Sequence, residues 1–150
     1  MDENQEFISI LRAEGLRYTW QRQAIWDEIK STDEHRDADD IYLSLKQAGK
    51  TISRATVYRT IDVLVKYGFI RKLEFGEGRM RLEHKLDPAH HDHLVCENCG
   101  RIIEFVDDRI EDLQTAVCQQ HGFQLTRHVH QLFARCQAYP DCEYYQSQHR

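Results

Sequence analysis

The sequence has no long apolar run, no secretory signal and no excess of basic residues. No apolar stretch approaches the roughly 20 residues needed to cross a bilayer. The first six residues, MDENQE, are acidic where a signal peptide would be basic and then apolar. The net charge is −5, from 20 Lys and Arg against 25 Asp and Glu. We therefore expect a cytoplasmic protein with no membrane segment, and 150 residues suffice for one domain or two small ones.

Cysteine is sparse, and four of the five cysteines form two close pairs, Cys96 with Cys99 and Cys136 with Cys142. In a reducing compartment such pairs are typical of zinc ligands rather than disulfides. Four thiolates complete the tetrahedral shell of Zn²⁺ and leave no open position for catalysis. The spacing therefore predicts a structural zinc site that ties the C-terminal segment to residues 96–101.

Three histidines and one aspartate directly precede the first cysteine pair. If residues 90–95 are extended, His90 and Asp92 point to one face while His91 and His93 point to the other. One short segment can then serve two different metal sites. Imidazole and carboxylate ligands suit Fe²⁺, Mn²⁺, Co²⁺ or Zn²⁺, and the ligand types alone do not separate these ions.

Charge divides the chain into two parts. Residues 1–85 carry 15 basic and 15 acidic residues, whereas residues 86–150 carry 5 and 10, together with seven of the nine histidines. We therefore predict a boundary near residues 85–89, with one domain at 1–85 and a second at 86–150.

Helical periodicity predicts four helices in the first domain, over residues 3–14, from Thr19 onward, over 37–48 and over 53–67. The apolar positions of the second helix, Trp20, Ala24, Ile25 and Ile29, fit the helical period. Alternating apolar residues then flank a glycine turn, Gly76-Glu77-Gly78, which is typical of a two-stranded hairpin. Helices followed by a hairpin predict a winged helix-turn-helix domain whose fourth helix enters the DNA major groove.

The fourth helix has an apolar stripe of Val57, Ile61, Leu64 and Val65, and this stripe leaves a polar face at its N-terminal end. On that face, Tyr58 can contact a thymine methyl group or stack, and Arg54 and Arg59 can reach phosphate or guanine. Further basic residues of the hairpin could touch the DNA backbone: Arg71, Lys72, Arg79 and Arg81. A helical hairpin with a solvated charged face is the alternative. The zero net charge of the domain differs from most DNA-binding domains and indicates weak binding that needs a second input.

The second domain is expected to be a small α/β unit, so that the whole chain belongs to the α+β class. Strands around 93–96 and 101–105 should flank the cysteine knuckle, followed by a helix from Asp107-Asp108 to about Gln120. A long strand from Phe123 to Ala134 would place His128 and His130 on one face. Cys118 is expected in the core of this domain, beside its helical neighbours Ile110, Leu113 and Val117.

Several ordered motifs together resemble the ferric uptake regulator (Fur) family over nearly the whole chain. They are Gly15-Leu16-Arg17-Tyr18-Thr19 with Arg22, Ala55-Thr56-Val57-Tyr58-Arg59, His90-His91-Asp92-His93-Leu94-Val95-Cys96-Glu97-Asn98-Cys99-Gly100 and Ile103-Glu104-Phe105. The resemblance implies a homodimeric, metal-responsive transcription factor, usually a repressor, with a winged-helix domain followed by a metal-binding dimerisation domain. Since dimeric readers present two recognition helices, the double-stranded DNA operator should have dyad symmetry.

The resemblance also implies three sets of site residues. A sensing site between the domains would use His35, Glu83, His91, His93 and Glu104, and a second site would use His90, Asp92, Glu111 and His128. The segment before His90 is one residue longer than the common pattern, which leaves His84 as an alternative to Glu83, and the C-x5-C spacing also departs slightly from the usual one. The DNA-binding residues would be Arg17, Arg54, Thr56, Tyr58 and Arg59.

Glu104 stands where peroxide sensors of the family carry aspartate, which favours the iron-sensing branch. The expected function is therefore a repressor of metal-uptake genes with a structural Zn²⁺ and a regulatory Fe²⁺, for which Mn²⁺ or Zn²⁺ could substitute. A zinc- or peroxide-sensing member of the same family is the alternative.

Two other classes of function compete with a regulator. A metal-dependent hydrolase could use the histidine cluster with Glu104 or Glu111 as general base. It would need a pocket and an open metal position, while the first 85 residues are typical of a DNA reader, so no enzymatic activity is expected. A purely structural zinc ribbon explains the cysteines but not the histidines, Tyr58 or Arg59.

Overall fold

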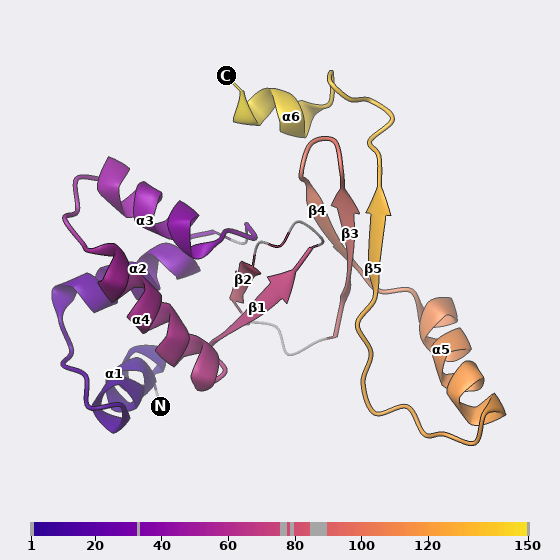
Figure 1. Ribbon diagram of the computed structural model, residues 1–150, viewed down its shortest axis with the longest axis horizontal. Helices are drawn as coiled ribbons and strands as arrows, with labels where there is room; N and C mark the ends of the chain where they lie inside the picture. The colour runs from indigo at the N-terminus through magenta and orange to yellow at the C-terminus, as the bar shows by residue number, and fades with distance from the viewer. Residues whose placement is uncertain (1, 33, 76–77, 79, 85–89, 150) are drawn as a thin grey trace. The chain divides into compact units, whose positions relative to one another are not determined.

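The computed structural model describes residues 2–32, 34–75, 78, 80–84 and 90–149 (Figure 1). The chain divides into two compact units, Met1–Pro88 and Ala89–Arg150. The predicted boundary at residues 85–89 lies outside the described residues, as do Arg79 and two residues of the predicted turn, Gly76 and Glu77. No helix in the described ranges is long and apolar enough to cross a membrane.

The first unit is a winged helix-turn-helix, as the sequence predicts. Its elements are the helices α1 (Glu3–Ala13), α2 (Trp20–Lys30), α3 (Ala38–Gln47) and α4 (Arg54–Lys66), then the antiparallel strands β1 (Ile70–Glu74) and β2 (Met80–His84). Ser53 caps α4 by accepting a hydrogen bond from the backbone N–H of Thr56 at 3.2 Å. Gly68, at φ +76°, ends this helix. Local capping therefore sets both ends of the predicted recognition helix.

Trp26 lies at the centre of the hydrophobic core of this unit. Its ring stacks on Phe7 at a centroid distance of 5.9 Å and meets Phe69 and His84 edge-on at 5.6 and 5.0 Å. Trp20, although its position fits the apolar period of α2, is 57% exposed. Trp20 is the first residue of α2, and the buried positions of the helix begin one turn later.

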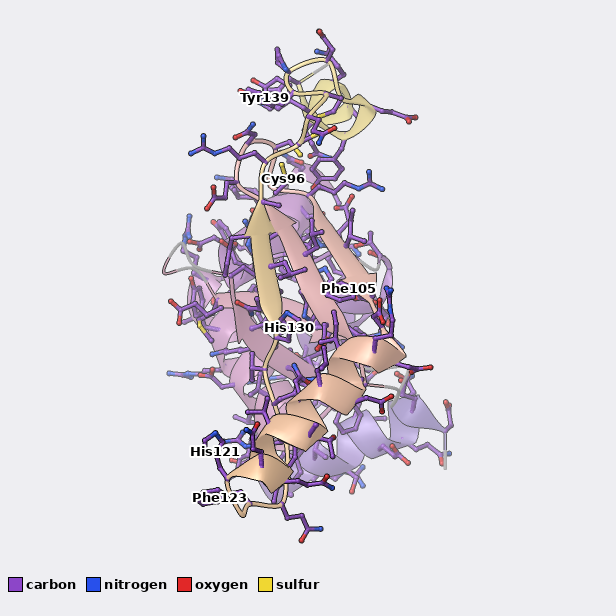
Figure 2. All side chains as sticks on the ribbon, turned by 90° about the vertical axis from the view of Figure 1, so that its right-hand side faces the viewer. Cys96, Phe105, His121, Phe123, His130 and Tyr139 are labelled. Atoms are coloured by element: carbon purple, nitrogen blue, oxygen red, sulfur yellow. The ribbon has the colours of Figure 1, made fainter. Side chains whose placement is uncertain are left out.

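The second unit contains a three-stranded mixed sheet with the order β4-β3-β5. Strand β3 (Asp92–Cys96) pairs antiparallel with β4 (Ile102–Phe105) and parallel with β5 (Gln131–Ala134). Helix α5 (Asp108–Gln120) lies between β4 and β5 in sequence, and a short helix, α6 (Glu143–Gln148), closes the chain. Figure 2 views this unit with α5 in front and places Cys96 and His130 near opposite ends of the sheet.

The predicted long strand from Phe123 to Ala134 is wrong, because only Gln131–Ala134 pairs as a strand. Strand β3 begins at Asp92, so its parallel ladder with β5 begins at the pair His93 and Gln131. Residues 123–130 therefore have no partner strand among the described residues. Val129 in this segment is 81% exposed.

The expected core around α5 is also absent from the described part of the chain. None of its side chains is fully buried, and Leu113 is 66% exposed. The apolar stripe that the sequence assigns to the core is thus an open face of α5 in one chain. Helix α6 was not predicted, since its six mostly polar residues carry no apolar period.

Candidate metal centres and DNA-binding surface

One cluster in the second unit brings together four potential metal ligands. Their ligand atoms all lie within 4.8 Å of one another. Asp92, on β3, is 1% exposed, and its Oδ1 lies 3.2 Å from Nε2 of both His90 and His128. Glu111, from the first turn of α5, places Oε1 3.3 and 3.5 Å from the same two imidazoles. Three segments of the chain therefore converge on one point.

The chemistry of this cluster fits a divalent transition-metal ion. Two buried carboxylate oxygens, Asp92 Oδ2 and Glu111 Oε1, form no hydrogen bond with any described residue. Buried polar atoms without such partners are costly unless a proton or cation compensates them. Two imidazoles and two carboxylates form the mixed donor set that suits Fe²⁺, Mn²⁺, Co²⁺ or Zn²⁺.

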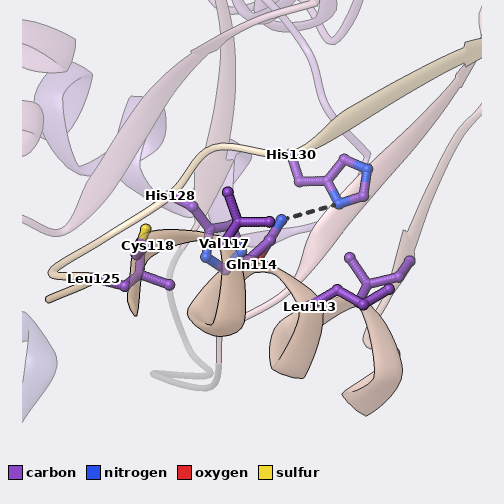
Figure 3. A pocket seen from close by; sticks show the side chains of 8 residues that line it. Leu113, Gln114, Val117, Cys118, Leu125, His128 and His130 are labelled. Carbon is purple, nitrogen blue, oxygen red and sulfur yellow. Dashed lines mark hydrogen bonds between the residues drawn. The ribbon is translucent and has the colours of Figure 1, made fainter. Parts of the chain in front are cut away.

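His130 also faces this cluster, although it is absent from the predicted ligand sets. Its Nδ1 lies 3.6 Å from Asp92 Oδ2 and 3.5 Å from Gln114 Nε2 (Figure 3). The predicted strand places His130 on the same face as His128, but it does not indicate which group that face meets.

A pair of potential metal ligands also lies within the first unit. His35 Nε2 is 3.3 Å from Glu83 Oε1, and both side chains are only 7% exposed. His84, the alternative to Glu83, lies on the other face of β2, where its ring meets Trp26 and its Nε2 is 3.6 Å from Glu3. Glu83, rather than His84, is therefore the residue that accompanies His35.

Three further predicted ligands gather on the sheet of the second unit. His93 on β3 lies directly opposite Glu104 on β4. His91 Nε2 is 3.6 Å from Glu104 Oε1, and the rings of His91 and His93 are 4.9 Å apart. The arrangement thus separates His91 and His93 from the cluster formed around Asp92.

The paired cysteines meet where β3 ends and β5 has just ended, near the labelled Cys96 in Figure 2. The Cys96 sulfur accepts backbone N–H groups from Cys99 at 3.4 Å and from Cys136 at 3.3 Å. Burial raises the pKa of Cys96, but these N–H groups outweigh it and hold the pKa below its ordinary value. Burial raises the pKa of Cys99 to about 11, with contributions from the neighbouring Cys96 and Cys142 thiols. Among the described residues, the four sulfurs do not all lie within 4.8 Å of one another.

The predicted DNA-reading face of α4 is open to solvent. Arg54, Tyr58 and Arg59 are exposed, while Val57 and Ile61 are buried. Asp39, from the first turn of α3, forms an ion pair with Arg54 and accepts a hydrogen bond from the Tyr58 hydroxyl at 3.1 Å. Asp39 was not singled out from the sequence, because its proximity to α4 depends on how two helices pack.

Arg17 and Thr56, which the resemblance also assigns to DNA binding, differ in their exposure to solvent. Arg17 is exposed, and its backbone carbonyl accepts a hydrogen bond from the Arg22 side chain at 2.7 Å. Thr56 is half-buried, and its hydroxyl is 2.9 Å from that of Ser53 at the start of α4.

A groove of about 460 Å³ lies beside the Asp92 cluster, between α5 and the segment before β5 (Figure 3). Its lining is mostly apolar and includes Leu113, Val117 and Leu125, together with Cys118 and the two histidines of residues 128–130. Cys118 is thus a half-buried lining residue of an open groove rather than part of a closed core.

Comparison with known proteins places this geometry in a family. The chain matches the ferric uptake regulator family over residues 13–133. The chain belongs to the ferric uptake regulator family. It is 38% identical over 134 residues to the ferric uptake regulation protein of Campylobacter jejuni, covering 88% of this chain and 85% of that one.

Solved structures of Fur proteins have the same fold. The Helicobacter pylori ferric uptake regulator, described as having three functional metal-binding sites, is 30% identical with a TM-score of 0.77, covering 91% of this chain and 95% of that one. A zinc-bound manganese uptake regulator is 34% identical with a TM-score of 0.70, covering 87% and 98%. Similarity to both leaves the sensed metal open.

Membership of the Fur family decides between the classes of function. Fur proteins are metal-binding, DNA-binding transcription regulators of metal uptake that act as homodimers, and they are not enzymes. The metal-dependent hydrolase is therefore excluded. A purely structural zinc ribbon is excluded as well, because the family includes the winged-helix domain.

Proposed function

We propose that this Fur protein is a cytoplasmic, ferrous-iron-responsive repressor of metal-uptake genes. The convergence of His90, Asp92, Glu111 and His128 around an almost fully buried carboxylate carries the metal-binding part of this proposal, because buried carboxylates need a compensating cation. Peroxide sensors of the family carry aspartate at the position of Glu104, so the glutamate here favours iron sensing over peroxide sensing. Mn²⁺ or Zn²⁺ could occupy the same ligands.

The regulatory ion is assigned to His35 and Glu83 of the first unit and to His91, His93 and Glu104 of the second. The proximity of His35 to Glu83, and of His91 to Glu104, supports the two halves of this set separately. An ion held by both units would favour one arrangement of the DNA-binding unit. It could act only through its higher affinity for that arrangement.

Cys96, Cys99, Cys136 and Cys142 are assigned to a structural Zn²⁺. Zinc–sulfur bonds of about 2.3 Å would draw the four sulfurs closer together. The backbone N–H groups of Cys99 and Cys136 that point at the Cys96 sulfur support this role, because they stabilise a thiolate, the form that binds zinc. The zinc would join the end of β3 to the segment after β5.

The operator is assigned to α4, with Arg54, Thr56, Tyr58 and Arg59 as contacts and Arg17 as a further one. The exposure of Arg54, Tyr58 and Arg59 supports this role. The open apolar face of α5 and the unpaired segment before β5 are proposed to lie at the homodimer interface. A two-fold dimer would present two recognition helices and read a site with dyad symmetry.

Gel-shift titration tests this function directly. The full-length chain should bind a dyad-symmetric operator more tightly with Mn²⁺ than with a metal chelator, and a single half-site should bind weakly in both conditions. Equal operator affinity with and without the ion would contradict the proposed function.

A further inference from the structure

Arg71 lies against a carboxylate that we assign to the regulatory ion. The hairpin register places Arg71 on β1 directly opposite Glu83 on β2. Arg71 Nη2 is 2.9 Å from Glu83 Oε2, while Glu83 Oε1 is 3.3 Å from His35 Nε2. One carboxylate therefore contacts a cation of the protein and an imidazole of the assigned ligand set.

The charges around Glu83 give Arg71 a defined role. Glu83 is 7% exposed, and a carboxylate this buried is stable only with a compensating positive charge. Arg71 supplies positive charge and stays protonated at any physiological pH. It therefore cannot lose its charge when a metal ion binds Glu83. A divalent ion on Glu83 would bring two more positive charges next to the same guanidinium.

We propose that Arg71 competes with the regulatory metal ion for Glu83 and sets the free metal concentration at which the site fills. Without the ion, the guanidinium holds the carboxylate. With the ion, the guanidinium remains nearby as a repulsive charge and weakens binding. The inference rests on the proposed function in one respect, namely that Glu83 is a ligand of the regulatory ion.

Competition and structural support predict opposite effects of removing the charge at position 71. If Arg71 only held the wing in shape, a neutral residue would weaken both the fold and metal binding. If Arg71 competes, a neutral residue weakens the metal-free protein, because Glu83 Oε2 loses the guanidinium 2.9 Å away, but tightens metal binding.

Lys72 offers a matched control. It is the next residue on β1 and carries the same charge, but its side chain points to the other face of the strand, where Nζ lies 3.3 Å from Asp62 on α4. Removing this charge alters the net charge equally without touching Glu83.

The test uses the full-length, zinc-loaded chain with His90→Ala, which disables the Asp92 cluster. Binding of Mn²⁺ is followed by electron paramagnetic resonance of the free ion, and the metal-free Tm is measured in parallel. Arg71 and the ion are both positive. Removing the Arg71 charge beside Glu83 should therefore lower the half-saturating Mn²⁺ concentration by about tenfold. Screening of Arg71, which is 42% exposed, reduces this toward about threefold.

Arg71→Gln and Arg71→Met should both show tighter Mn²⁺ binding and a lower metal-free Tm. Arg71→Lys should bind Mn²⁺ like the parent, and Lys72→Gln should stay within about twofold of it. Two neutral variants protect the test against a folding defect in one of them.

Neutral variants at Arg71 that bind Mn²⁺ no more tightly than Lys72→Gln, or less tightly than the parent, would overturn the inference. Absence of Mn²⁺ binding to the His90→Ala chain would overturn both this inference and the regulatory ligand set. If that chain binds Mn²⁺ while its operator affinity stays constant, the proposed function is contradicted, and the Arg71 variants still decide the competition.

Discussion

Replacement of Asp92 by Asn should empty the second metal cluster without unfolding the protein. Asp92 is the central ligand because its Oδ1 lies 3.2 Å from both His90 and His128, and it is 1% exposed. The amide has the same shape as the carboxylate but no charge. The metal-free Tm of Asp92→Asn should therefore stay near that of the parent.

The size of the effect follows from burial. Removing one partner of a buried charge pair costs about 3–5 kcal/mol. Here the lost free energy is that of binding the second metal ion. Each 1.4 kcal/mol is a factor of ten in affinity, so the second ion should bind at least about a hundredfold more weakly.

Direct Mn²⁺ titration of the zinc-loaded chain measures this effect. In the proposed assignment the parent has two kinds of Mn²⁺ site, the regulatory site and the second site. Asp112→Asn is the matched control, because it removes the same charge from an exposed position on α5, one residue after Glu111. If Asp92→Asn and Asp112→Asn bind the second Mn²⁺ equally well, Asp92 is not a ligand.

Four further substitutions, with one control, test the zinc site and the DNA-reading face. Cys96→Ser should lose about one zinc per chain and lower the Tm, because metal binding and folding are coupled; unchanged zinc content by elemental analysis would rule out the thiolate site. Tyr58→Ala and Arg59→Ala should each weaken operator binding by about 1–3 kcal/mol at unchanged metal content, whereas Tyr67→Ala, at the C-terminal end of the same helix, should not. Burial and then the hydrogen bond to Asp39 raise the pKa of Tyr58, so Asp39→Asn should lower that pKa in an ultraviolet titration, and an unchanged pKa would show that the contact is absent in solution.

The parts of the fold that depend on local sequence could be predicted. Helix α4 follows from the cap at Ser53, the apolar period and the glycine at position 68. The separation of Asp92 from His93 follows from strand alternation in β3, and His90 and His91, just before this strand, continue the same pattern.

The parts that depend on distant partners could not be predicted. Strand β5 is short because only four of its residues meet β3, and no local signal in residues 123–134 marks that limit. The apolar period of α5 is real, but periodicity does not tell whether the same chain or a second subunit covers it. The contact of Arg71 with Glu83 depends on the hairpin register. The sequence does not fix this register, because it does not determine how many residues form the turn.

The sharpest test of the account is operator affinity at buffered free concentrations of Fe²⁺, Mn²⁺ and Zn²⁺, measured anaerobically for the parent, His91→Ala and His90→Ala. The parent should bind the operator more tightly with Fe²⁺ or Mn²⁺ than without a metal ion. His91→Ala should lose this metal response, and His90→Ala should keep a weakened one. Identical curves for the two variants would contradict the assignment of two separate metal sites. A parent curve that is flat for every ion would contradict metal-responsive DNA binding itself.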